Sequence, residues 1–189
     1  PIPDNKAIFI EPLAAALEIL DQINIPDKSE VLVLGDGKLA LLCGFVLSTT
    51  NCNLTMVGKH ENKLQLMAGF GVNTEMAHSF SGGNFDIVVE ATGNPDALKI
   101  ALDNVKPRGT VILKSTCADS TEYNFSPVVV NEITIIGSRC GLFSKSIEFI
   151  EKYDPPLESL ISKEMPLHEA VEAFEYSSRP DIIKVILTM

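Results

Sequence analysis

A strand, a glycine turn and a helix in immediate succession, at positions 31–40, constrain the fold of this chain most strongly. Val31–Leu34 is an uninterrupted apolar run, which predicts a strand buried on both faces of a sheet. The turn Gly35-Asp36-Gly37 follows at once, and the mostly apolar sequence from Lys38 to Thr50 predicts a helix. A buried strand that passes through a tight turn into a helix is typical of α/β folds with a parallel sheet.

The small residues of this Gly-x-Gly-x-x-Ala pattern each have a physical role. Gly35 permits the sharp turn, and Gly37 lets the backbone approach a pyrophosphate. Ala40, and Gly44 one turn further on, let the helix lie close to the sheet. The N–H groups at the start of the helix then form an anion site, although a tight turn that binds nothing is the alternative. The predicted dinucleotide contacts are Gly35, Asp36, Gly37, Lys38 and Leu39.

Strands and helices alternate along the rest of the chain. Further strands are predicted at 53–57, 72–76, 85–90, 110–114 and 133–138, with a final one at 182–187. Helices are predicted at 11–23, 61–70, 95–105, 142–153 and 168–176. This order predicts an α/β fold, a Rossmann-type doubly wound parallel six-stranded sheet with helices on both faces.

The chain divides into three expected parts. Residues 1–28 form an entry segment and a linking helix, and residues 29–153 form the dinucleotide-binding Rossmann domain. Asp154-Pro155-Pro156 breaks the chain, and residues 154–189 form a C-terminal extension of a helix and a strand.

The composition argues against several classes of partner. The formal net charge of −10 disfavours binding to nucleic acid or to an anionic membrane surface. No apolar stretch approaches the roughly 20 residues that span a bilayer, and no leader pattern is visible. The cysteines are not spaced as a zinc knuckle or a disulfide framework, so we expect reduced thiols in the cytoplasm. These cysteines are Cys43, Cys52, Cys117 and Cys140.

The end of the second strand predicts the type of dinucleotide. Units that bind NAD usually place an acidic residue there, which accepts hydrogen bonds from the adenosine ribose. Here Gly58 leaves room instead, and Lys59 and His60 offer positive charge where a 2′-phosphate would lie, with Lys63 one turn further on. This basic cluster predicts NADP, with NAD as the second choice. A solvated helix start without a ligand is the alternative.

The loops after the fourth and fifth strands should line the nicotinamide half of the crevice, because ligands bind outside the carboxyl ends of such strands. The first loop contains Thr92-Gly93-Asn94, and the second contains Lys114-Ser115-Thr116. Ordinary capping of the loops is the alternative for each of these residues. The cofactor contacts predicted in this half are Ala91, Thr92, Gly93, Ser115 and Thr116.

Several short segments have a characteristic order and spacing: Pro1–Asp4, Glu11–Ala14, Val31–Ala40, Glu90–Gly93, Pro107–Thr110, Ile135–Arg139, Met165–Ala170 and Lys184–Leu187. In this order and spacing they resemble the medium-chain dehydrogenase/reductase family, and within it the zinc-type alcohol and polyol dehydrogenases. The position of Arg139 in that family makes it a further candidate for a phosphate or ribose contact, and a surface ion pair is the alternative.

The resemblance covers the cofactor-binding half of that family alone. It implies that a preceding lobe, which carries the Cys and His-Glu zinc ligands, is not part of this sequence, and that the C-terminal extension would return to that lobe. Glu11 matches a polyol-dehydrogenase glutamate beside the zinc, so we expect it to approach a metal only with the missing lobe. A helix-start glutamate stabilised by the helix dipole is the alternative. Dimerisation through the sixth strand is common in the family, so we expect a homodimer.

Two functions remain open. The first is the NADP-binding domain of a zinc-type alcohol or polyol dehydrogenase, which transfers hydride between an alcohol and a nicotinamide cofactor. This chain alone would then be inactive, and zinc would be present only in the complete enzyme. The second is a stand-alone, non-catalytic dinucleotide-binding module. An upstream reading frame with Cys and His-Glu motifs would support the first, and a start codon just before Pro1 would favour the second.

Overall fold

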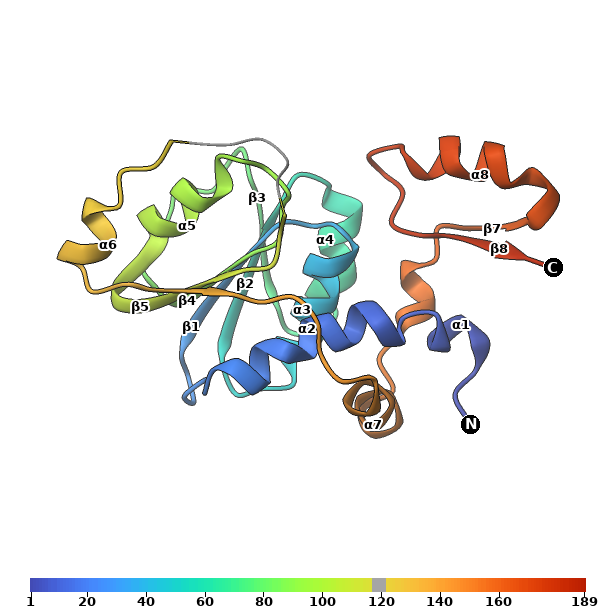
Figure 1. Ribbon diagram of the computed structural model, residues 1–189, viewed down its shortest axis with the longest axis horizontal. Coiled ribbons are helices and arrows are strands. Elements are labelled where there is room, and N and C mark those ends of the chain that lie inside the picture. The colour runs from blue at the N-terminus through green and yellow to red at the C-terminus, as the bar shows by residue number, and fades with distance from the viewer. Residues whose placement is uncertain (117–121) are drawn as a thin grey trace.

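The computed structural model describes residues 1–116 and 122–189, so the predicted free thiol of Cys117 lies outside the described residues. Six parallel strands form the central sheet in the order β3-β2-β1-β4-β5-β6 (Figure 1). This is the strand order of the dinucleotide-binding doubly wound fold, so the predicted fold is confirmed. The strands are β1 (Glu30–Leu34), β2 (Asn53–Gly58), β3 (Asn73–Met76), β4 (Phe85–Glu90), β5 (Val105–Leu113) and β6 (Thr134–Gly137).

Helices cover both faces of this sheet. On one face lie α2 (Ile10–Gln22), α3 (Lys38–Ser48), α4 (Glu61–Ala68) and α7 (Phe143–Tyr153). On the other lie α5 (Ala97–Asn104) and the short α6 (Ser126–Val130), which the sequence analysis did not predict. In Figure 1, α5 and α6 flank the sheet on the left, and α2, α3 and α7 flank it on the right and below.

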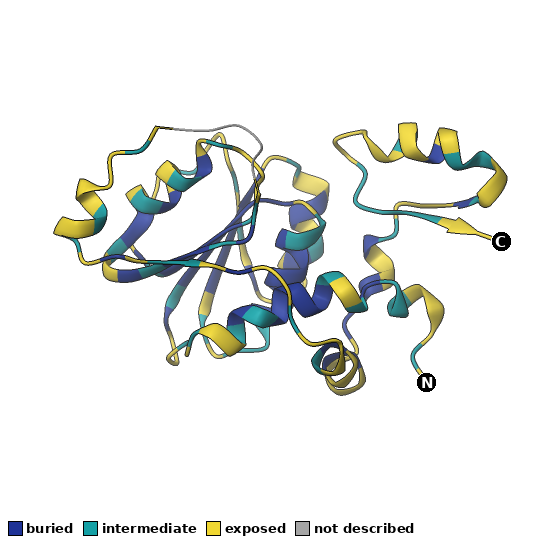
Figure 2. Cartoon of the chain, in the orientation of Figure 1, coloured by how far each residue is buried: buried dark blue, intermediate teal, exposed yellow. Residues whose placement is uncertain are grey.

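The apolar run of β1 is explained by two separate cores. Val31 and Val33 belong to the core under α2 and α3, whereas Leu32 and Leu34 belong to the core under α5. Because side chains alternate along a strand, a strand with a helix layer on each face needs apolar residues at every position. Figure 2 shows these strands as the most continuously buried part of the molecule.

Close packing of α3 explains its small residues. Ala40 is fully buried, and a Cβ atom at Gly44 would lie 2.5 Å from Met56 Sδ and 2.9 Å from Met67 Cε. Glycine therefore lets α3 approach β2 and α4, as the sequence pattern predicts.

The predicted boundary of the fifth strand is wrong. The sequence predicts a turn at Lys106–Gly109 before a strand that begins at 110, but β5 begins at Val105. The pairing of β4 with β5 is irregular between Phe85 and Ile87, and Arg108 has a φ of 64°. These turn-forming residues therefore lie inside β5, where the strand is irregular, and do not form a separate turn between α5 and the strand.

The C-terminal segment, residues 154–189, is more ordered than predicted. It contains α8 (Ala170–Ser177) and a two-stranded parallel sheet of β7 (Lys163–Pro166) and β8 (Val185–Thr188). The four residues of β7 are too few and too polar for the alternation rule to detect. Two short 3₁₀ helices, η1 (Leu157–Leu160) and η2 (Leu167–Glu169), complete it, and α1 (Asp4–Ala7) lies against η1. Within the described residues, no helix is both long enough and apolar enough to span a membrane.

Candidate functional site

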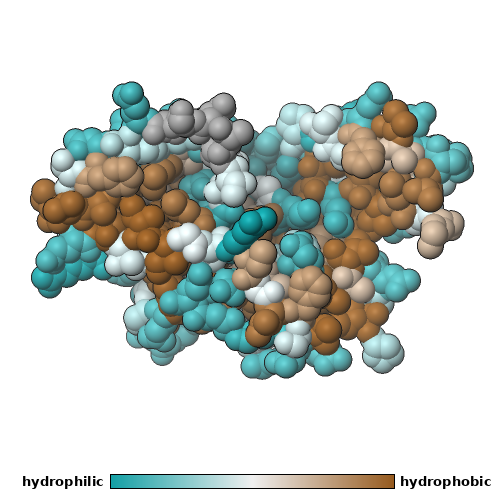
Figure 3. Space-filling model, in the orientation of Figure 1, coloured by the Kyte–Doolittle hydropathy of each residue, from teal (hydrophilic) through white to brown (hydrophobic). Residues whose placement is uncertain are grey.

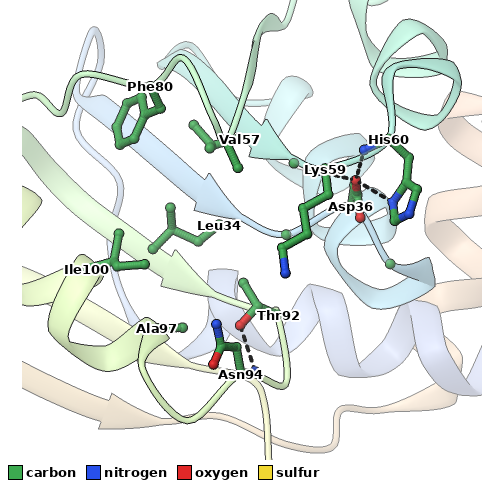
Figure 4. A pocket seen from close by; sticks show the side chains of 14 residues that line it. Leu34, Asp36, Val57, Lys59, His60, Phe80, Thr92, Asn94, Ala97 and Ile100 are labelled. Carbon is green, nitrogen blue, oxygen red and sulfur yellow. Dashed lines mark hydrogen bonds and ion pairs between the residues drawn. The ribbon is translucent and has the colours of Figure 1, made fainter. Parts of the chain in front are cut away.

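A cavity of about 300 Å³ opens at the carboxyl ends of β1, β2 and β4 (Figure 4). Strand β1 pairs with β2 on one side and with β4 on the other. The sheet therefore grows on one side of β1 up to β3, and on its other side from β4 onwards. Doubly wound sheets bind their ligands at such a switch point. The cavity brings together seven predicted contacts: Gly35, Asp36, Gly37, Gly58, Lys59, His60 and Thr92.

The two glycines of the first turn are required for different reasons. Gly35 has a φ of 118°, and a Cβ atom there would lie 2.7 Å from the carbonyl oxygen of Ala91, so the fold itself requires glycine. Gly37 has a φ of −73°, and a Cβ atom there would meet no heavy atom within 4 Å. The fold does not need glycine at position 37, and the free space beside it faces the cavity.

The helix that follows begins without a side-chain cap. Gly37 is the N-cap of α3, and no side chain of residues 1–116 or 122–189 bonds to the first amide groups of this helix. The first N–H groups of a helix have no partner within the helix, and the helix dipole adds partial positive charge there. The turn therefore presents an anion site beside an open glycine, which fits a pyrophosphate.

Asp36 lies over the end of β2 and connects the two turns that border the cavity. Its Oδ2 atom accepts hydrogen bonds from the backbone N–H groups of Lys59 and His60, both at 2.6 Å. His60 Nδ1 lies 3.0 Å from the same oxygen. Figure 4 shows these three interactions converging on one carboxylate oxygen.

The predicted basic cluster is smaller than the sequence indicated. His60 faces Asp36, and Lys63 is buried with its ammonium group 2.6 Å from the carbonyl oxygen of Pro180. The prediction that Lys63 extends the cluster is therefore wrong. Lys59 is exposed, its side chain points into the cavity in Figure 4, and its ammonium group has no ion-pair partner among the described residues.

An apolar slot, which no pattern in the sequence predicts, forms one end of the cavity next to β2. Figure 4 shows Val57, Phe80, Ala97 and Ile100 around this slot. Ile100 is 42% exposed, which is unusual for a large apolar residue on a helix that packs on a sheet. The residues come from β2, α5 and the loop after β3, so no local pattern connects them. An apolar slot next to a ribose site suits an adenine ring.

The loop after β4 is held by a buried carboxylate. Oε1 of Glu90 accepts hydrogen bonds from the N–H group and the hydroxyl of Thr92, both at 2.7 Å, and from the hydroxyl of Ser115 at 3.2 Å. The Ser115 hydroxyl in turn accepts a bond from Gly93 N at 2.8 Å. Thr92 and Asn94 line the cavity, but seven other predicted contacts do not: Lys38, Leu39, Ala91, Gly93, Ser115, Thr116 and Arg139.

The prediction that Lys114 lines the crevice is wrong. Its side chain is buried and donates hydrogen bonds to the carbonyl oxygen of Ala15 and, at 2.9 Å, to the hydroxyl of Ser138. Burial lowers the pKa of this lysine. Lys114 therefore links the sheet to α2 instead of contacting a ligand.

The ammonium group of Lys184 lies over the ring of Phe9, 5.4 Å from the ring centroid. Burial lowers the pKa of the Lys184 ammonium group, the charge of Lys38 lowers it further, and Glu11 acts in the opposite direction. Glu11 itself is exposed, and no cluster of three or more His, Cys, Asp or Glu residues in the described part of the chain could hold a metal ion. The residues described here therefore do not make a zinc site.

Comparison with protein families gives one match, to a family described as zinc-binding dehydrogenase, over residues 39–153. Among curated proteins, the chain is similar to a D-xylulose reductase of Saccharomyces cerevisiae, with 25% identity over 98% of the chain and 59% of that protein. It is also similar to glucose 1-dehydrogenase 2 of Vulcanisaeta moutnovskia, with 30% identity over 97% of the chain and 59% of that protein. The chain thus spans about three-fifths of the length of these relatives.

Solved structures of the same fold include cofactor complexes. A putative zinc-binding dehydrogenase from Sinorhizobium meliloti bound to NADP has a TM-score of 0.87 and 20% identity, over 96% of this chain and 58% of that one. A short chain alcohol dehydrogenase from Escherichia coli in complex with NADH has a TM-score of 0.90 and 21% identity, over 100% and 60% of the two chains.

Proposed function

Because this chain belongs to the zinc-binding dehydrogenase family, we propose that it is the NADP-binding domain of an alcohol or polyol dehydrogenase. The observation that carries the proposal is Gly37. The fold does not require glycine at position 37, and this residue lies at an uncapped helix N-terminus beside a cavity of about 300 Å³. A pyrophosphate there accounts for both features.

The rest of the cavity suits the adenosine half of such a cofactor. The adenine ring fills the apolar slot between Phe80 and Ile100, and the ribose lies at the carboxyl end of β2. The nicotinamide, which accepts or gives hydride when the cofactor is bound, then extends past Thr92.

The preference for NADP over NAD rests on Lys59. Its ammonium group points into the cavity and has no ion-pair partner among the described residues, so it is free to bind a 2′-phosphate. A charge-assisted contact contributes roughly 1.5–3 kcal/mol, which solvent exposure and salt reduce. We expect one such contact, because His60 faces Asp36.

Calorimetric titration of the chain with NADP and with NAD at fixed ionic strength tests this proposal. Lys59→Ala should weaken NADP binding about tenfold and change NAD binding less than twofold. Lys152→Ala is the matched control, because it removes the same charge from α7, outside the cavity. No measurable binding of either dinucleotide would refute the proposed function. Equal affinity for the two would refute the choice of NADP.

We propose that catalysis needs a second lobe, since the described residues hold no zinc site. The chain with NADP, zinc and a panel of alcohols and polyols should show no alcohol-dependent absorbance of NADPH at 340 nm. Zinc-dependent turnover by this chain alone would contradict the assignment of catalysis to another lobe. A non-catalytic binding module would behave in the same way in this assay, so the gene upstream of Pro1 distinguishes the two.

We also propose a homodimer that pairs β6 of one copy with β6 of a second. Strand β6 is an edge of the sheet, and Ile135 and Ile136 are half-buried there. An unpaired apolar edge is an aggregation hazard unless it is covered. Light scattering at high micromolar concentration should give a dimeric mass, and a strictly monomeric mass would exclude this pairing.

The thiols support a reducing compartment such as the cytoplasm. Cys43, Cys52 and Cys140 are free, and burial raises the pKa of the Cys43 thiol to about 12.

A further inference from the structure

Asp36 occupies the place of the acidic residue that the end of β2 lacks. A Cβ atom added to Gly58 would lie 2.6 Å from Asp36 Cβ and 2.7 Å from Asp36 Oδ2. The absence of an acid from the β2 sequence therefore does not mean that the space is empty or basic. A carboxylate stands there, and it comes from the turn after β1.

The two oxygens of this carboxylate have different surroundings. Oδ2 accepts all three hydrogen bonds, from Lys59 N, His60 N and the His60 ring. Oδ1 has no partner among the described residues, although Asp36 is only 8% exposed and lines the cavity. Ser146 Oγ is the buried side-chain atom without a partner among the described residues, so Asp36 Oδ1 is accessible from the cavity and can accept a hydrogen bond from a bound ligand.

We propose that Asp36 Oδ1 accepts a hydrogen bond from the 3′-hydroxyl of the adenosine ribose. The inference rests on the proposed function, because it assumes that a dinucleotide occupies the cavity. Asp36 and Lys59 then contact different groups of the same ribose. Asp36 binds the hydroxyl that NAD and NADP share, and Lys59 binds the 2′-phosphate that only NADP carries.

The bonds to Oδ2 fix the carboxylate for this role. Two backbone donors and one ring hold its orientation, so little side-chain entropy is lost when the ribose binds. The same bonds join the turn after β1 to the turn after β2, and thus set the position of Lys59. Substitution of Gly58 by aspartate would not add a second acceptor, because its side chain would collide with Asp36.

A comparison of 5′-ADP with 3′-deoxy-ADP tests this contact, because the two ligands differ by one hydroxyl. The unchanged chain should bind 5′-ADP about tenfold more tightly. Asp36→Ala should bind the two equally, and Asp36→Asn should prefer 5′-ADP less than threefold. Asp103→Ala, an exposed acid of α5, is the matched control and should keep the full tenfold preference. A residue that acts only on the structure would weaken both ligands alike and leave their ratio unchanged.

The outcomes separate this inference from the proposed function. If NADP and 5′-ADP bind but the preference for the hydroxyl persists in Asp36→Ala, the role of Asp36 is wrong and the cofactor assignment stands. A lack of preference in the unchanged chain has the same meaning. If neither NADP nor 5′-ADP binds, both proposals fail. Asp36→Asn, which preserves the side-chain shape, decides the question if Asp36→Ala does not fold.

Discussion

The central sheet buries its apolar side chains, whereas the C-terminal segment leaves several of them exposed. In β1, Val31, Leu32 and Val33 are fully buried between two helix layers. In α8, by contrast, Val171 is 72% exposed and Phe174 is 73% exposed. Figure 2 shows the same contrast, with dark strands in the sheet and a mostly yellow and teal C-terminal segment.

This difference in burial shows which part of the chain covers its own apolar surface. Both faces of the sheet are covered by helices from this chain. The C-terminal segment is anchored at one end by Leu157 and Leu160, which are fully buried in the main core. Its outer surface carries apolar side chains, visible in brown on the right of Figure 3. We propose that this surface contacts the catalytic lobe of the complete enzyme.

The same substitution in the two regions should give the largest difference. Leu42→Ala removes a fully buried side chain from the core under α3 and should lower the free energy of unfolding by about 2–5 kcal/mol. Leu167→Ala removes a side chain that is 54% exposed and should change it by less than about 0.5 kcal/mol. Urea unfolding followed by circular dichroism measures both values. Equal losses would mean that the C-terminal segment has a core of its own.

Hydrogen exchange should also distinguish the two sheets, with a smaller difference in free energy than the two substitutions give. The amide groups of β7 and β8 belong to a two-stranded sheet with little burial, so they can open locally without unfolding the main core. We expect their opening free energy to be about 2 kcal/mol below that of β1, or roughly 30-fold faster exchange under the same conditions. Exchange of β8 at the rate of β1 would show that both regions unfold as one unit.

A pH effect within the central sheet should be the smallest. The Lys106 ammonium group, 2.8 Å from Asp86, lowers the pKa of this carboxyl, and Glu30 N also donates to it. A lowered pKa in the folded state means that the ionised form stabilises the fold near neutral pH, and that this contribution is lost as the pH falls below about 4. The side chain is 40% exposed, so the effect should stay below about 1 kcal/mol.

Asp86→Asn measures this contribution. The variant should be less stable than the unchanged chain at pH 7, and the difference should shrink towards pH 3. Glu132→Gln is the control, because its Arg108 pair is far more exposed. A difference that grows on acidification would contradict the sign of the pKa shift.

The sequence predicts the features that one segment encodes by itself. The run Val31–Leu34 and the Gly35–Gly37 turn are local patterns, and the structure has the strand, the turn and the helix there. The six-stranded parallel sheet follows from the alternation of such units. The wrong boundary of β5 has a local cause too, since Pro107 and Gly109 usually mark turns and here lie in an irregular strand.

The parts of the site that the sequence missed depend on contacts between distant segments. The carboxylate of Asp36 reaches residues 23 and 24 positions away, so a search at the end of β2 could not find it. The sequence shows Lys63 and Lys114 only as charged residues. In the structure, each ammonium group donates a hydrogen bond to a backbone carbonyl oxygen more than 90 positions away. The apolar slot around Phe80 and Ile100 likewise forms only when α5 packs on the sheet.

The most direct test of the central claim is a map of where NADP binds. In a ¹⁵N-labelled chain titrated with NADP, the amide signals of Gly35–Lys38 and Gly58–His60 should shift together with one affinity. The signals of α8 and β8 should stay in place, because no residue of these two elements lines the cavity. Shifts confined to the C-terminal segment, or no shifts at saturating NADP, would contradict the account.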